Sequence, residues 1–334
     1  METRKVQVTG GSTYTVSIPK DWARENDVEG GSEVGMFPSD SSLVIETLDP
    51  ADEDREGVMD ITGLEGDHLL RAVITMYVSG FDVMKFESDR ITSSQRRTLR
   101  KASQRLAGLE VIEETGDVVV FQDLLDSSQL SIHRSVSRMR LIAESMFEDS
   151  VKAVVENDDA ISDDVVERDE DVDRMFAMVS RTFRSSLHDA RSEEEMGVTR
   201  DTCFDYYTTA RQLERVADHA AKIAEISREI DDEIDDEIGE ALYEASQDSV
   251  EIVDDAVSAL MDLDDDAATE RANEVLDSVS EIEEEHTREI DKKIRDLDPQ
   301  TAQALGLVID SINRAADYGA NIAETALESA APKP

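Results

Sequence analysis

The chain has 334 residues, which is too long for one ordinary domain, and it carries a formal net charge of −45. Hydrophobic residues make up 39% of the chain but aromatic residues only 4%, so we expect a largely aliphatic core of the kind found in helix bundles. The acidic residues are spread along most of the sequence, which favours a solvated surface suited to very high salt over a partner mimic or a cation store.

The first part of the chain, residues 1–48, is predicted to be a small all-β module. Alternating apolar and polar residues predict a strand over 13–18, followed by a short helix after Pro19 and by strands near 34–37 and 43–45. A segment of this size buries too little surface to be stable alone. We therefore expect it to form an intertwined homodimer.

An acidic linker, 49–56, separates this module from a predicted α/β domain over 57–124. Hydrophobic patterning predicts helices over 66–78 and 93–106. Strands are expected near residues 58–61, 81–86, 110–114 and 117–121.

From about residue 127 the pattern becomes helical and contains an internal repeat. Residues 213–225 recur in degraded form as 312–324, and residues 148–155 resemble 254–261. Two such matches indicate a tandem duplication. We predict two three-helix bundles, at 127–230 and 232–328, with a single six-helix array as the alternative.

Paired acidic residues on these helices suggest a cation site. Glu214 and Asp218 lie four residues apart and are neighbours on one helix face, where they repel each other. Asp169 and Asp173, with the same spacing, are the expected donors from the middle helix. Oxygen donors of this kind suit a hard cation, and local pairing with basic residues on the same helix is the structural alternative.

The second copy is weaker. Asn313 replaces the first carboxylate, which leaves Asp317 and a neutral oxygen ligand. Asp310 is a further candidate, but its spacing favours an ion pair with Arg314.

The two Arg-x-x-Asp helices, each followed by Ile-Ala-Glu, resemble the signature helices of the PhoU family of phosphate-uptake regulators over residues 127–328. The resemblance implies two three-helix bundles and divalent or trivalent metal ions (iron, manganese or magnesium) held by a Glu/Asp-x-x-x-Asp motif. It also implies repression of phosphate import and of phosphate-responsive signalling when phosphate is plentiful. Glu214 and Asp218 match the motif in full, whereas only Asp317 matches it in the second copy.

Residues 3–47 contain Ser-Ile-Pro-Lys within a basic setting and resemble the AbrB/SpoVT swapped-hairpin domain. That family implies a dimer that binds DNA by a basic face, with Arg4, Lys5, Lys20 and Arg24 on the phosphates. The alternative is a module that only dimerises.

A second basic segment stands out in so acidic a chain. Between residues 90 and 105 there are six basic residues and no acidic one: Arg90, Arg96, Arg97, Arg100, Lys101 and Arg105. Arg96, Arg97, Arg100 and Lys101 are predicted DNA contacts, while a small anion or an acidic surface of the same protein remain alternatives. The order of the segments is similar to that of archaeal fused AbrB–PhoU regulators.

The predicted fold class is thus multidomain: an all-β swapped-hairpin module, a small α/β domain and all-α tandem three-helix bundles. A lone cysteine, Cys203, and the lack of a leader-like start or a long apolar run lead us to expect a cytoplasmic protein. No Gly-rich phosphate loop or catalytic triad is evident, so we expect no enzyme.

We predict a homodimeric regulator of phosphate transport that also binds DNA. The alternative is an adaptor that docks on the ATPase of the phosphate ABC transporter, or on a signalling kinase, with the N-terminal module only dimerising. A metal-storage or metalloenzyme bundle would need Glu-x-x-His motifs, which the signature helices lack.

Overall fold

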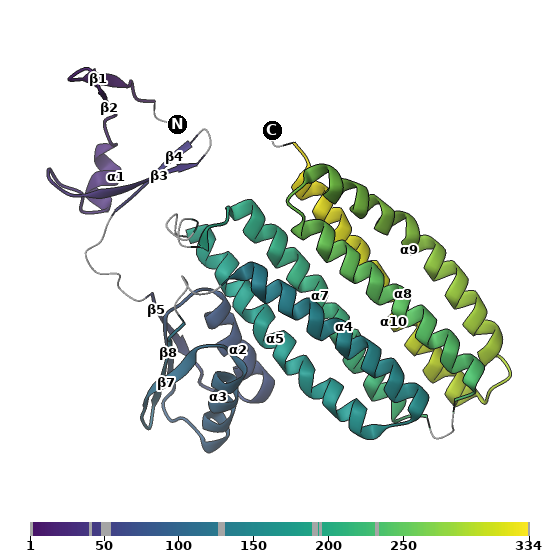
Figure 1. Ribbon diagram of the computed structural model, residues 1–334. Helices are drawn as coiled ribbons and strands as arrows, with labels where there is room; N and C mark the ends of the chain where they lie inside the picture. The colour runs from purple at the N-terminus through teal and green to yellow at the C-terminus, as the bar shows by residue number, and fades with distance from the viewer. Residues whose placement is uncertain are drawn as a thin grey trace. The chain divides into compact units, whose positions relative to one another are not determined.

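The computed structural model describes residues 3–39, 42–47, 55–125, 131–188, 193, 196–230 and 234–332. It divides into two compact units, Met1–Glu53 and Asp54–Pro334 (Figure 1). No described helix is both long enough and apolar enough to cross a membrane.

The first unit consists of two antiparallel hairpins and a short helix. Its elements are β1 (Gln7–Thr9), β2 (Thr13–Thr15), α1 (Lys20–Glu25), β3 (Val34–Ser39) and β4 (Ser42–Thr47). Gly10 and Gly11 both have positive φ values and form the tight turn between β1 and β2. Because β1 is only three residues long, β2 ends at Thr15 and not at Ile18 as the alternation predicted.

The second unit begins with a four-stranded sheet and two helices. These are β5 (Glu56–Asp60), α2 (Gly66–Val78), β6 (Val83–Glu87), α3 (Ser93–Arg105), β7 (Leu109–Glu114) and β8 (Val118–Asp123). The strand order is β5-β6-β8-β7, with β5 and β6 parallel and the other pairs antiparallel. The helices bury Leu69, Val73 and Leu99 against Phe86 and Phe121 of the sheet.

Among the residues that the structure describes, the helical half contains two sets of three long helices, so the predicted fold class is confirmed. The first set is α4 (Ile132–Glu156), α5 (Asp159–His188) and α7 (Arg200–Ser227), and the second is α8 (Asp236–Met261), α9 (Asp265–Ile294) and α10 (Pro299–Ala330). Side-chain N-caps begin five of them: Ser131, Thr199, Asp235, Asp264 and Asp298. Figure 1 shows the two sets side by side, and their apolar stripes form one continuous core.

The two sets meet through equivalent helices of the repeat. Helix α7 packs on α10, and α4 packs on α8. At the α7–α10 contact, His219 and Tyr318, which occupy the same position in the two copies, lie with ring centroids 5.6 Å apart. The duplicated helices therefore pack against each other through equivalent positions of the repeat.

Candidate functional site

Four carboxylates gather where α5 packs against α7. Asp169 and Asp173 lie one turn apart on α5, and Glu214 and Asp218 lie one turn apart on α7. The charge of Asp218 raises the pKa of both Asp169 and Asp173, and the charge of Asp173 raises the pKa of Glu214. The structure therefore brings together all four acidic residues that the sequence proposed for the first copy. We call this group the α5–α7 acidic cluster.

The cluster holds its protons more tightly than ordinary carboxylates do. Burial, followed by repulsion from neighbouring carboxylates, raises the pKa of both Asp169 and Glu214 to about 7. Burial is also the largest cause of the raised pKa of Asp173 and of Asp218, although both are exposed when the whole residue is considered. Near neutral pH the cluster therefore carries less negative charge than its composition suggests.

The donor set of the cluster is chemically suited to a hard cation, because every donor is a carboxylate oxygen. Arg105 lowers the pKa of Asp173 and Arg215 lowers that of Asp218, yet both pKa values stay raised, so these cations do not neutralise the site. Within the described residues, no three His, Cys, Asp or Glu side chains converge as the ligands of one metal ion. The four carboxylates would have to draw closer to share a cation.

The second copy places its candidate ligands differently. Asn313 Nδ2 donates a hydrogen bond of 2.8 Å to Thr287 Oγ1, and Asp317 Oδ2 accepts one of 3.0 Å from Arg314 Nη1. The expected pairing of Arg314 with Asp310 is therefore wrong. Asp310 instead lies 4.0 Å from Lys222 Nζ, because α7 packs beside α10 and supplies a competing cation.

Glu144 is a further acidic residue, half-buried on α4, that was not among the residues predicted from the sequence. Burial raises its pKa to about 7, ahead of the opposing effect of Arg140. Arg140 Nη1 lies 2.6 Å from Asp254 Oδ1, so the pair links α4 to α8. The available signal was the position of Glu144 beside Ala143 and Met146 in the apolar stripe of α4.

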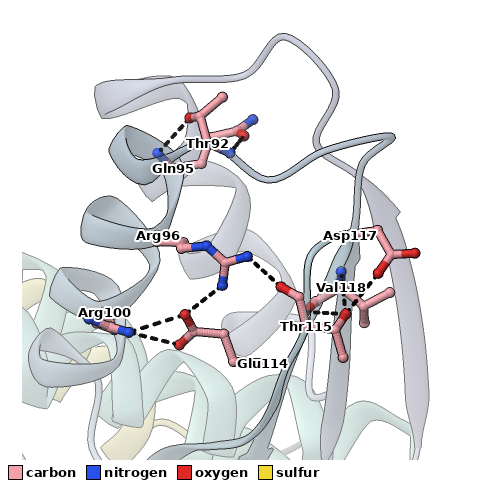
Figure 2. Close-up of polar contacts among 8 residues, drawn as sticks. All are labelled: Thr92, Gln95, Arg96, Arg100, Glu114, Thr115, Asp117 and Val118. Atoms are coloured by element: carbon pink, nitrogen blue, oxygen red, sulfur yellow. Dashed lines mark hydrogen bonds and ion pairs between the residues drawn. The ribbon is translucent and has the colours of Figure 1, made fainter.

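Two arginines of the basic helix α3 form ion pairs within the α/β domain (Figure 2). It begins with a capping box between Thr92 and Gln95. One turn further on, Arg96 and Arg100 both bind the Glu114 carboxylate of β7, Arg100 Nη2 at 3.1 Å from each oxygen. These hydrogen bonds, that of Arg96 first, lower the pKa of Glu114.

At the end of α3, Arg105 forms an ion pair with Glu170 of α5. The alternative prediction, that the basic segment pairs with an acidic surface of the same protein, therefore holds for Arg105. Arg97 and Lys101 are exposed, as are Arg4, Lys5, Lys20 and Arg24 of the first unit. Of the eight predicted DNA contacts, Arg96 and Arg100 are the two with ion-pair roles within the α/β domain.

Two family models match the chain. Residues 136–227, which include the whole α5–α7 acidic cluster, match the model described as PhoU domain. The chain carries a PhoU domain. Residues 7–52 match the model described as antidote-toxin recognition MazE, bacterial antitoxin, in agreement with the AbrB-like hairpin module expected there. The second helical set lies outside the residues that the PhoU model matches.

Two solved structures are similar to part of the chain. The crystal structure of the phosphate transport system regulatory protein PhoU from Streptococcus pneumoniae is 19% identical, covers 59% of this chain and 93% of its own, and has a TM-score of 0.48. PhoU from Pseudomonas aeruginosa is 17% identical over the same shares, with a TM-score of 0.43. No curated protein matches the chain.

Proposed function

We propose that this protein regulates phosphate transport and phosphate-responsive signalling through its PhoU domain. The observation that carries the proposal is that the domain match and the α5–α7 acidic cluster fall in the same segment, 136–227. Cells that encode the protein should take up more labelled phosphate at high external phosphate once the gene is deleted. Unchanged uptake in the deletion strain would count against this role.

The acidic cluster is proposed to bind a divalent or trivalent cation such as iron, manganese or magnesium. A cation would offset the repulsion between Glu214 and Asp218 and displace the protons that Asp169 and Glu214 hold near neutral pH. Tying α5 to α7 in this way would stiffen the first bundle. Such a change is a physical means of passing a signal to the rest of the chain.

Metal content and proton release test this cation site. Protein purified at high salt without chelator should contain metal by elemental analysis, and adding metal to the stripped protein should release protons. Glu214→Gln/Asp218→Asn should lose both effects. Glu240→Gln/Glu244→Gln, which neutralises an exposed acidic pair of the same spacing on α8, should keep them. Equal metal content in the two double variants would rule out the cluster as the binding site.

The first unit is proposed to form a homodimer that binds DNA. No residue among 3–38 and 42–47 is buried, and apolar side chains such as Val8 and Tyr14 are 64% and 77% exposed. Burial against a second copy would supply the missing core. It would also double the basic set of Arg4, Lys5, Lys20 and Arg24.

The runner-up function is a protein–protein adaptor that docks on the ATPase of the phosphate ABC transporter or on a signalling kinase. It is favoured by the internal ion pairs of Arg96, Arg100 and Arg105, which leave less basic charge for DNA. The two functions separate in a promoter-binding assay at the working salt concentration. Lys5→Glu/Lys20→Glu/Arg97→Glu should abolish binding if the protein binds DNA, whereas failure of both wild type and variant to bind would favour the adaptor.

A further inference from the structure

A cavity of about 360 Å³ lies between the α/β domain and the first helical set. Its walls come from α2, the end of α3, α5 and α7, which all belong to the second unit. This volume falls within the range of small-molecule sites, which are mostly apolar with a few polar groups that orient the ligand. The cavity adjoins the α5–α7 acidic cluster through Asp173, which the two share.

Two aromatic rings line one side of the cavity, and two further rings outside the lining extend the same row of contacts. Phe176 and Tyr207, which line it, are stacked with centroids 6.0 Å apart and an interplanar angle of 20°. Tyr207 in turn stacks on Phe183 at 4.9 Å, and Phe183 contacts Phe204 at 5.8 Å. Aromatic residues are only 4% of the chain, and none of these four is fully buried. The rings therefore form a partly open platform and not a piece of sealed core.

The same cavity gathers positive charge in a strongly acidic protein. Arg105, Arg184 and Arg211 line it, against Glu170 and Asp173. Arg105 is committed to its ion pair with Glu170, whereas Arg184 is exposed. Arg guanidinium groups suit phosphate and carboxylate, because their planar forks donate two parallel hydrogen bonds.

Arg211 connects the charged and aromatic features of the site. Its guanidinium carbon lies 5.1 Å from the centroid of Phe176, within the range of a cation–π contact. Tyr207 stacks on both Phe176 and Phe183, and Arg211 covers Phe176, so a ligand ring would meet Phe176 and Tyr207 at their edges, with the Arg211 cation beside it. An aromatic ligand ring packs favourably against such edges, because edge-to-face contact is a preferred arrangement of aromatic pairs.

We propose that this cavity binds a small anion with a planar ring, of the nucleoside phosphate class. The ring lies against Phe176 and Tyr207, and the phosphate is held by Arg184 and Arg211. Because α2 supplies Ile74, Thr75 and Val78 to the same cavity, and Ser79 follows directly after it, the ligand contacts both the α/β domain and the bundle. Its binding strengthens the joint between them, and this inference does not depend on the proposed role in phosphate transport.

Calorimetric titration of the full chain with AMP, ADP and ATP at high salt tests the proposal, with inorganic phosphate as a separate arm. Saturable binding of at least one nucleotide is expected, together with a higher unfolding temperature. Arg211→Gln, Arg184→Gln and Phe176→Leu should each weaken binding by on the order of tenfold. Arg71→Gln, an exposed arginine of α2 that does not line the cavity, is the matched control and should bind as the wild type does.

Three results would overturn the assignment. They are no binding of any nucleotide at millimolar concentration, equal affinity for inorganic phosphate and AMP, and an equal loss of affinity in Arg71→Gln. Arg184→Gln changes an exposed side chain and should leave the fold intact. Circular dichroism of each variant distinguishes lost binding from lost structure.

Discussion

Arg181 Nε lies 2.7 Å from Asp123 Oδ2, and this ion pair joins the helical half of the protein to its α/β domain. Arg181 extends from α5 and also donates hydrogen bonds of 2.8 Å to Tyr77 O, Phe81 O and Asp82 Oδ1. Both side chains of the pair are largely buried, at 11% and 6% exposure. One side chain thus satisfies acceptors from three segments of the neighbouring domain.

Replacing Arg181 by methionine should destabilise this joint strongly. The change leaves Asp123 buried without its cation, a loss that costs about 3–5 kcal/mol in comparable sites. Urea unfolding at constant high salt measures the free energy, and limited proteolysis should show earlier cleavage between the two domains. Arg174→Met on the same helix breaks only an i,i+3 pair with Asp171 and should cost less than about 1 kcal/mol. Similar losses in the two variants would contradict the special role of Arg181.

The repeat made much of the helical half predictable. Periodicity within each helix and the recurrence of 213–225 indicated helix order, and the i,i+4 spacing placed Asp169 with Asp173 and Glu214 with Asp218. Their meeting across α5 and α7 required only that the middle helix pack on the signature helix. The contacts of Arg181 were not predictable in this way, because they join residues between 58 and 104 positions apart with no periodic signal.

Local rules failed where a neighbouring helix supplied a competing partner. Asp310 has the correct spacing for Arg314, but Lys222 of α7 lies beside it and Arg314 turns to Asp317. In the first unit, the alternation of apolar residues continued to Ile18 while β2 ended at Thr15. The apolar residues of this pattern, Val6, Val8, Tyr14 and Val16, are exposed in the single chain, as the proposed dimer requires.

The dimer proposal predicts that Val8→Lys/Tyr14→Lys makes the protein monomeric. The two residues are cross-strand partners in the β1–β2 hairpin and are exposed in the single chain, so charges there would oppose burial against a second copy. Light scattering after gel filtration measures the mass. Leu263→Lys changes a fully exposed leucine after α8 and should leave the mass unchanged. A wild-type monomer, or a double variant that stays dimeric, is incompatible with the proposal.

The raised pKa values of Asp169 and Glu214 predict an unusual pH dependence in metal-free protein. Both folded pKa values, about 7, exceed the ordinary values of 3.8 and 4.5. Each group therefore favours the folded state below about pH 4 and loses that contribution as the pH rises through about 7. The unfolding temperature, measured in the presence of chelator, should therefore increase as the pH is lowered from about 8 to about 5. The slope per group is at most about 1.4 kcal/mol per pH unit, and solvent screening makes it smaller.

Asp169→Asn/Glu214→Gln isolates the contribution of these two groups, because the rest of the acidic chain also titrates. This double variant should be more stable than the wild type above about pH 7 and should show a shallower pH dependence. Glu240→Gln/Glu244→Gln removes the same formal charge from an exposed site and should keep the wild-type slope. Identical slopes in all three proteins would mean that the cluster carries ordinary carboxylates.

Two glycines of α10 should respond oppositely to alanine. At Gly319, which packs on α8, a Cβ atom would lie 2.5 Å from Ile252 Cγ2 and 3.2 Å from the Val253 backbone nitrogen. Forcing these helices apart should cost about 1–3 kcal/mol. At Gly306 a Cβ meets nothing within 4 Å, so Gly306→Ala should stabilise α10 by up to about 1 kcal/mol through helix propensity. Urea unfolding measures the free energy of unfolding of the two variants. If both variants were more stable than the wild type, α10 would not pack closely on α8 at Gly319.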